Sequence, residues 1–148
     1  MGLPQEIFLF VSHLLPLVNV DLLIQDAKGR TLLTWRDDVF CGSGWHIPGG
    51  ILRFKERLET RIAKVAAIEV GTTVDFNPVP LAVNQCIDPD PIRRDRGHFI
   101  SFLYRCRIPD DYVIDNRNRK PTDPGFAAWH ENCPENLIAV HRIYRKFI

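Results

Sequence analysis

The heptapeptide GWHIPGG at residues 44–50 is the stretch of sequence that decides the fold. Residues 45–47 suit a short extended segment, and residues 48–50 predict a tight turn whose backbone carbonyls no side chain covers. A helical pattern follows over residues 56–70 and brings Glu69 back to the side of the turn. Because a carbonyl and a carboxylate are hard oxygen donors, this loop and helix predict a site for Mg²⁺ or Mn²⁺.

The predicted helix has one apolar face and a defined end. The residues of that face recur at steps of three or four positions: Leu58, Ile62, Val65, Ala66 and Glu69. Gly71 is the expected C-terminal stop. A carboxylate on an otherwise apolar face is costly unless it has a partner, which favours Glu69 as a metal ligand over a plain surface residue.

The segments on either side predict an α+β fold with a mixed β-sheet. Residues 18–25 and 31–36 flank a turn, so they predict a β-hairpin. Further strands are expected at residues 73–76, 81–87, 98–108 and 126–131, with a short N-terminal helix at about residues 4–15 and a helical tail from residue 134. Strands before and after one central helix are typical of α+β proteins, and we expect one domain over residues 1–148.

Composition excludes several classes of partner. The 148 residues carry a formal net charge of +1, so no global field draws nucleic acid or an anionic membrane, and we expect neither as a partner. The apolar stretch at residues 7–18 is short and interrupted, so we expect it to pack on the domain or on a partner subunit. The scattered cysteines form no zinc-ligand pattern and predict reduced thiols in a cytoplasmic protein: Cys41, Cys86, Cys106 and Cys133.

The spacing of Gly50, Glu56, Lys64, Glu69 and Gly71 resembles the Nudix box. That motif reads Gly, five residues, Glu, seven residues, then Arg-Glu-apolar-any-Glu-Glu-any-Gly-apolar. This copy is degenerate, because Lys64 stands at the Arg position and two of the Glu positions are apolar, Val65 and Ile68.

The reduced box is similar to that of the GDP-mannose mannosyl hydrolases, which also keep fewer carboxylates. Residues 16–21, 32–36 and 44–50 resemble the same branch. The resemblance implies the Nudix α/β/α sandwich with a mixed sheet and a homodimer. It also implies a hydrolase that depends on Mg²⁺, or on Mn²⁺, and acts on a nucleotide sugar. The expected reaction is the cleavage of GDP-mannose to GDP and mannose.

The resemblance also assigns roles to individual residues. Glu69 and the Gly49 carbonyl match the metal-binding positions, and Glu56 is expected to orient the loop or cap the helix. Asp21 and Arg36 match positions that bind the nucleotide or stabilise the departing diphosphate. A buried structural pair for Asp21 and a solvated strand end for Arg36 are the alternatives.

A further group of cations is expected near the phosphates. Lys64 replaces the Arg of the box, and Arg93 and Arg94 lie in a polar loop with Arg96 beside the expected site. His98 matches a histidine of the mannosyl hydrolases and is a candidate for substrate binding and catalysis. An exposed helix lysine, solvated arginines and a core histidine are the alternatives.

Two departures from the branch leave the chemistry open. Ile51 stands where the branch carries an Arg after the double glycine, and Asp123 and Pro124 stand where it carries a Gln-His pair that supplies a metal ligand and a general base. The resemblance therefore makes Asp123 a candidate metal ligand as well as a candidate catalytic residue. Proline cannot accept a proton. Either Asp123 or His98 serves as the base, or water attacks phosphorus in another nucleoside diphosphate derivative, or the chain binds a sugar nucleotide without turnover.

Overall fold

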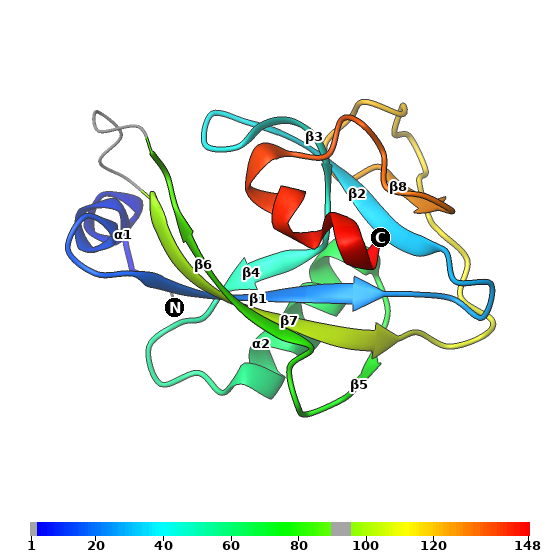
Figure 1. Cartoon of the computed structure of the whole chain (residues 1–148), viewed down its shortest axis with the longest axis horizontal. Helices are drawn as coiled ribbons and strands as arrows, with labels where there is room; N and C mark the ends of the chain where they lie inside the picture. Colours follow the sequence, from blue (N-terminus) through cyan, green and yellow to red (C-terminus); the bar gives the residue numbers. More distant parts are fainter. Residues whose placement is uncertain (1–2, 90–95) are drawn as a thin grey trace.

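The computed structural model describes residues 3–89 and 96–148 and contains two β-sheets (Figure 1). In the larger sheet, β1 pairs in parallel with β7, and the remaining pairs are antiparallel, so the sheet is mixed. Its strands are β4 (Gly49–Ile51), β1 (Leu17–Ile24), β7 (His98–Arg107), β5 (Asp75–Phe76) and β6 (Ala82–Ile87). The expected α+β fold with a mixed sheet is therefore confirmed.

The smaller sheet has β2 (Thr31–Asp38) at its centre, between β3 (Gly42–His46) and β8 (Ala127–His130). The predicted hairpin of residues 18–25 and 31–36 is present only next to its turn, where Gln25 and Thr31 form an antiparallel bridge and the Asp26 N–H donates to the Arg30 carbonyl. Beyond that point β1 and β2 belong to different sheets. β1 instead pairs with β7 along its whole length and with β4 over residues 19–21.

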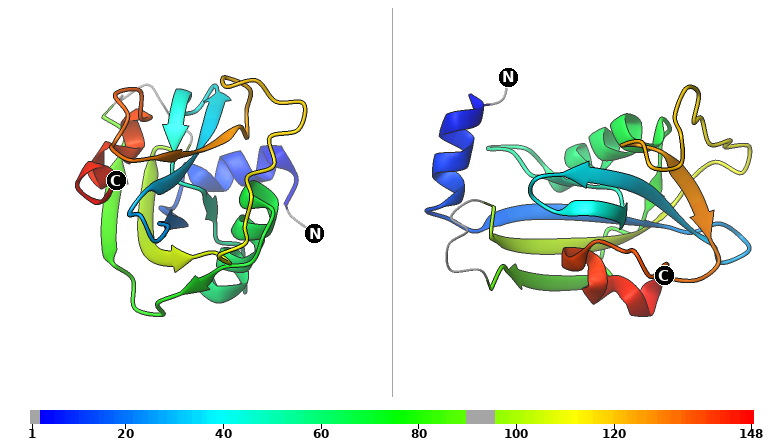
Figure 2. Two further views of the ribbon diagram at one scale, coloured as in Figure 1. Left: turned by 90° about the vertical axis from the view of Figure 1, so that its right-hand side faces the viewer. Right: turned by 90° about the horizontal axis from the view of Figure 1, so that it is seen from above.

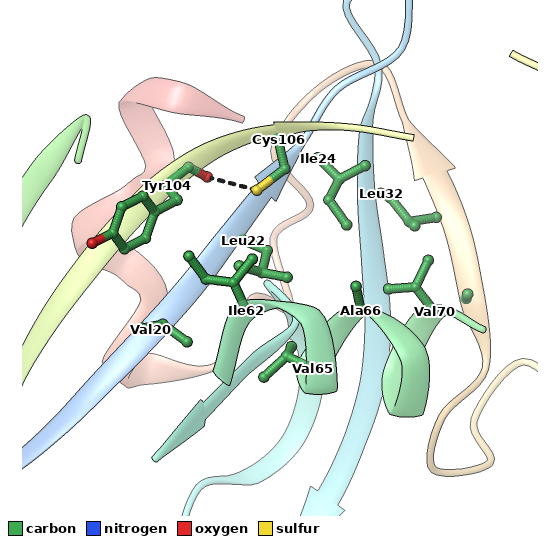
Figure 3. Close-up of a cluster of buried hydrophobic side chains, with 11 residues drawn as sticks. Val20, Leu22, Ile24, Leu32, Ile62, Val65, Ala66, Val70, Tyr104 and Cys106 are labelled. Atoms are coloured by element: carbon green, nitrogen blue, oxygen red, sulfur yellow. Dashed lines mark hydrogen bonds between the residues drawn. The ribbon is translucent and has the colours of Figure 1, made fainter. Parts of the chain in front are cut away.

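Helices cover the larger sheet on both faces (Figure 2). On one face lie α2 (Leu58–Val65) and the π-helical turn η1 (Ala66–Val70), and on the other lies the 3₁₀ helix η2 (Ala139–Phe147). The two faces follow from the alternation of side chains along β1. Val20, Leu22 and Ile24 pack with α2 and η1 on one face, whereas Leu23 packs with η2 on the other. Figure 3 shows the hydrophobic core between the larger sheet and the helices α2 and η1, the first core.

The first core explains the apolar face that the sequence predicts for the helix. Ile62 and Val65 of α2 and Ala66 of η1 are buried against β1 and β7. The helix ends as expected at Gly71, which has a φ of 78° and donates its N–H to the Ala66 carbonyl over 2.9 Å. The last turn is therefore widened to a π-helix, a feature that sequence periodicity does not encode.

The ends of the chain differ in detail from the expected helices. The N-terminal helix α1 covers Gln5–Ser12 and lies beside the start of β1 (Figure 1). The C-terminal tail is a 3₁₀ helix that buries His141 and Tyr144. None of the four cysteines takes part in a disulfide bond. Over residues 3–89 and 96–148, no helix combines the length and the apolar character needed to cross a bilayer.

Candidate active site

A cavity of about 390 Å³ lies where the two sheets meet the end of the central helix. Five elements or loops supply its wall: Arg36 comes from β2, His46 from β3, Gly49 from β4, Glu69 from η1, and Arg119 from the loop before β8. The structure thus brings together three residues that the sequence singles out, Arg36, Gly49 and Glu69.

Gly49 is held in a strand and not in the predicted turn. Residues 49–51 form the edge strand β4, and the sequence prediction of a tight turn over residues 48–50 is wrong there. The flanking bonds, from Leu22 N–H to the Pro48 carbonyl and from Leu52 N–H to the Val18 carbonyl, involve alternate residues of the ladder. In an antiparallel pair, the Gly49 carbonyl then points away from β1, on the free side of the sheet.

The glycine at position 49 is required by its neighbour in the sheet. A Cβ added there would lie 2.2 Å from Asp21 Oδ1 and 2.9 Å from the Val20 carbonyl oxygen. At position 50 a Cβ would lie 2.8 Å from Val65 Cγ2. The double glycine therefore lets β4 pack tightly between β1 and α2. This close packing explains why residues 49–51 form a strand and not the expected turn.

Glu69 reaches the cavity from the π-helical turn and faces a histidine. Its Oε2 lies 3.3 Å from His46 Nε2, and its side chain is 27% exposed. His46 is nearly buried, and its Nδ1 lies 2.8 Å from the Thr34 carbonyl oxygen. A carbonyl can only accept, so Nδ1 carries the proton and Nε2 is the ring atom that faces Glu69.

Arg36 is held in place by an acidic neighbour on the same strand. Its Nε donates to Asp38 Oδ2, while Asp38 Oδ1 accepts the N–H groups of Phe40 and Cys41 at 2.8 and 2.9 Å. Burial opposes the charge of Arg36, but the bond to Asp38 outweighs it and raises the pKa of Arg36 above its usual value. The cavity wall therefore carries a fixed, permanently charged guanidinium.

Asp21 lies behind Gly49 and away from the cavity wall. The residue is 1% exposed, and its carboxylate accepts hydrogen bonds from Tyr144 Oη at 2.5 Å and from Asn19 Nδ2 at 2.7 Å. Burial raises its pKa to about 6, although both hydrogen bonds act in the opposite direction. The alternative of a buried structural pair is the one that the structure presents, with Tyr144 as the partner.

His141 lies beside Asp21 and also supports the segment that leads into β4. Its Nδ1 accepts the Ile47 N–H at 3.0 Å, and its Nε2 lies 3.9 Å from Asp21 Oδ1. Burial, with smaller electrostatic contributions from the neighbouring His46 and Arg36, holds the pKa of His141 well below its usual value. A neutral His141 and the buried Asp21 thus support β4 from the side opposite α2.

Glu56 orients the loop after the double glycine, as expected. Its nearly buried carboxylate accepts the Arg53 N–H at 3.0 Å, and it pairs with Arg61 at 2.6 Å and with Lys64 at 2.8 Å. Burial opposes the charged form, but the bonds from Lys64, the Arg53 N–H and Arg61 prevail and lower the pKa of Glu56 to about 2. Lys64 is therefore engaged with Glu56, outside the cavity wall.

The remaining predicted site residues lie elsewhere. His98 begins β7 and its Nε2 lies 3.0 Å from Gln85 Nε2. It is five residues before Leu103, the partner of Asp21, and therefore roughly 16–17 Å away along the strand. Asp123 accepts the Lys120 N–H at 2.7 Å, while the next residues, Pro124 and Gly125, line the cavity.

The predicted phosphate contacts of Arg93 and Arg94 fall outside the described residues. Arg96 is described, and its guanidinium lies over the rings of Phe8 and Phe40, at 5.0 and 4.2 Å from their centroids. Arg96 therefore stacks between α1 and the loop after β2.

The side chains present suit a cation that keeps water and takes ligand oxygens from a substrate. Within residues 3–89 and 96–148, no group of three or more His, Cys, Asp or Glu side chains could enclose a metal. The outward carbonyl of Gly49 and the carboxylate of Glu69 nevertheless share the cavity. Mg²⁺ is commonly held by one or two carboxylates plus substrate phosphates, so this donor set fits an open site and not a closed one.

Sequence reasoning missed His46 as a wall residue and missed the support from His141 and Tyr144. The alternation of β3 carries a signal only for the burial of His46, because Gly44 and His46 are buried and Trp45 between them is less so. Nothing local marks His141 and Tyr144, which lie 94 and 123 residues from the groups they contact.

Comparison with known proteins supports the fold but not a particular activity. No protein-family model matches the sequence. Among solved structures, the MutT NUDIX hydrolase from Burkholderia pseudomallei is similar, with a TM-score of 0.70 and 20% identity, over 90% of this chain and 98% of that one.

Two more distant likenesses agree with the first. The MutT protein from Methanosarcina mazei Go1 has a TM-score of 0.59 and 21% identity, over 89% of this chain and 90% of that one. An ADP-ribose pyrophosphatase from Streptococcus suis 89-1591 has a TM-score of 0.57 and 15% identity, over 85% of this chain and 81% of that one. The chain therefore has the fold of the Nudix hydrolases.

Proposed function

We propose that this protein is a hydrolase that uses a divalent cation, Mg²⁺ or Mn²⁺, to cleave a nucleotide sugar. The substrate that the sequence resemblance favours is GDP-mannose, cleaved to GDP and mannose. The observation that carries the proposal is the shared cavity of Gly49, Glu69 and Arg36, which sets a carbonyl and a carboxylate beside a fixed guanidinium.

The wall of the cavity divides into a cation-binding side and an anion-binding side. Glu69 and the Gly49 carbonyl would hold the cation, which supplies positive charge against a departing diphosphate when it is bound. Arg36, fixed by Asp38, binds and orients phosphate oxygens, and Arg119 adds a second guanidinium on the same wall. The diphosphate is thus drawn to one place before any bond breaks.

Of the two candidate bases, Asp123 is the one beside the cavity. Its neighbour Pro124 lines the wall, whereas His98 lies at the far end of β7. Asp123 would need to exchange its bond to the Lys120 N–H for a water molecule. Accordingly, we propose Asp123 as the residue that accepts the proton of the attacking water.

A second candidate is attack by water at phosphorus in another nucleoside diphosphate derivative. The likeness to an ADP-ribose pyrophosphatase favours it. The two reactions differ in which bond water cleaves, so the position of the incoming oxygen separates them. Turnover in ¹⁸O-labelled water places the label in the sugar for attack at carbon and in a phosphate for attack at phosphorus.

A turnover screen with a matched pair of variants tests the proposal. Nucleotide sugars are incubated with Mg²⁺ or Mn²⁺ and either the native protein, Glu69→Gln or Glu59→Gln. Glu59 lies in the same helical segment with a side chain 56% exposed, so its variant controls for the lost charge. We expect Glu69→Gln alone to lose turnover by more than about 100-fold. Tight GDP binding without turnover by the native protein would instead favour a binding protein.

A homodimer is part of the same proposal. The N-terminal segment exposes several large apolar side chains, which support a contact with a second copy: Leu3, Ile7, Phe10, Leu14 and Leu15. Sedimentation of the native protein and of Phe10→Ser tests it. A native monomer at micromolar concentration would remove the dimer from the proposal.

A further inference from the structure

We propose that His46 is a metal ligand together with Glu69, so that the cavity binds a divalent transition metal, such as Co²⁺ or Zn²⁺, in preference to Mg²⁺. The inference deepens the proposed function and rests on it for any role of the cation in turnover. Binding of the cation itself depends only on the two side chains and is measured without substrate.

The orientation of the His46 ring is the first observation. Nδ1 lies 2.8 Å from the Thr34 carbonyl oxygen, so Nδ1 carries a proton and donates there, and in the neutral ring that a metal requires the lone pair is on Nε2. Histidines that bind metals commonly donate their other N–H to a backbone carbonyl or a carboxylate, which fixes the ring. The outer partner that a ligating histidine requires is therefore already in place.

The Thr34 hydroxyl does not compete for that lone pair. Its Oγ1 lies 3.3 Å from Nδ1 and 3.4 Å from Nε2. An atom almost equally distant from both ring nitrogens lies along the lone-pair direction of neither. The Nε2 atom thus remains directed at the cavity, where its neighbour is the Glu69 carboxylate.

The separation of the two donors is the second observation. Nε2 of His46 and Oε2 of Glu69 lie 3.3 Å apart. Imidazole nitrogen and carboxylate oxygen bind Zn²⁺ at about 2.1 Å, so two such ligands at angles of 90–110° lie roughly 3.0–3.4 Å apart. The pair is therefore spaced as two neighbouring ligands of one cation, and the Gly49 carbonyl is a third donor on the same wall.

The chemistry of the donors sets the preference among cations. Imidazole suits Zn²⁺ and neighbouring transition metals, whereas Mg²⁺ prefers an all-oxygen shell. This chain has Val65 and Ile68 where the sequence motif carries carboxylates, and the structure brings an imidazole to Glu69 instead. Positions that protein donors leave open would be filled by water or by a phosphate.

Binding of Co²⁺ to the metal-free protein tests the inference. Calorimetry gives the affinity, and visible absorption reports the ligand field of Co²⁺. The informative variants are His46→Asn and Glu69→Gln. Asparagine keeps a donor near the Thr34 carbonyl but lacks the Nε2 ligand. His13→Asn, at an exposed histidine at the end of α1, is the matched control. Thermal unfolding of each variant without metal checks that the fold is retained.

We expect the native protein and His13→Asn to bind Co²⁺ with the same affinity, at least about tenfold more tightly than they bind Mg²⁺. His46→Asn and Glu69→Gln should each bind Co²⁺ at least about tenfold more weakly than the native protein does. Zn²⁺ binding should shift the ¹⁵N resonance of His46 Nε2 and leave that of Nδ1 nearly unchanged. Unchanged Co²⁺ affinity in a folded His46→Asn variant overturns the inference, as does native binding of Mg²⁺ as tight as that of Co²⁺.

The two proposals fail in different ways. Turnover with Mg²⁺ that His46→Asn retains in full would leave the proposed function standing and remove His46 as a ligand. Co²⁺ binding through His46, with no turnover of any nucleotide sugar, would keep the metal site and remove the hydrolase.

Discussion

The carboxylate of Asp21 occupies the space that a side chain at residue 49 would need. The two residues are paired across β1 and β4, and a Cβ on Gly49 would meet Asp21 Oδ1 at 2.2 Å. Asp21 and the strand β4 beside the cavity therefore form one structural unit, in which Tyr144 Oη donates a hydrogen bond to the Asp21 carboxylate.

Replacing Gly49 by alanine is expected to destabilise the fold by about 1–3 kcal/mol, because the added methyl group overlaps a backbone oxygen and a buried carboxylate. Denaturant unfolding measures the free energy. A double-mutant cycle with Asp21→Ala should recover part of the loss, since one of the two overlaps is then removed. Strict additivity of the two changes would contradict the contact.

The stability of the metal-free protein should fall as pH rises through the range of the Asp21 carboxyl group. The folded pKa of Asp21, about 6, lies above its usual value of 3.8, so the folded state binds this proton more tightly than the unfolded state does. The stability contributed is full below about pH 4 and is lost by about pH 6. The difference amounts to roughly 3 kcal/mol, at about 1.4 kcal/mol per pH unit.

Asp21→Asn isolates this contribution, because asparagine carries no titrating proton and can still accept from Tyr144. We expect the difference in unfolding free energy between the native protein and this variant to change between pH 4 and pH 6.5. Parallel profiles for the two proteins would show that Asp21 does not titrate in this range.

Glu56 should behave in the opposite sense. Its folded pKa of about 2 lies below the usual 4.5, so its stabilising effect is present above pH 4.5 and is lost as pH falls through about 2. Glu56→Gln should cost about 1–3 kcal/mol at neutral pH, since Arg61 is left with an unpaired charge. Lys64→Gln removes the exposed partner and should cost less than about 1 kcal/mol. Equal losses would contradict this ranking.

Arg36 should contribute to nucleotide affinity through its fixed guanidinium. Arg36→Gln is expected to weaken GDP binding about tenfold, equivalent to about 1.4 kcal/mol. Arg57→Gln, at a side chain 81% exposed, is the control for the lost charge and should bind like the native protein. Titration calorimetry with GDP measures both, and equal affinities would exclude Arg36 from the site.

Local sequence determined the apolar face of the central helix and its stop at Gly71, but not the strand at Gly49 or the π-helical last turn. The apolar steps of Ile62, Val65 and Ala66, the stop at Gly71 and the approach of Glu69 to Gly49 all act within about two dozen residues. Helix periodicity and glycine chemistry are local properties, so they can be read from the sequence without knowledge of the remaining fold.

Tertiary structure alone decided which other side chains meet at the cavity. β1 pairs with β4 and β7, whereas β2 lies in a second sheet, and this arrangement of the two sheets brings His46 to Glu69. The register of β1 and β7 placed His98 far from the cavity, and the packing of η2 brought Tyr144 to Asp21. These contacts depend on strand pairing and on burial between segments far apart in the chain, which no local pattern encodes.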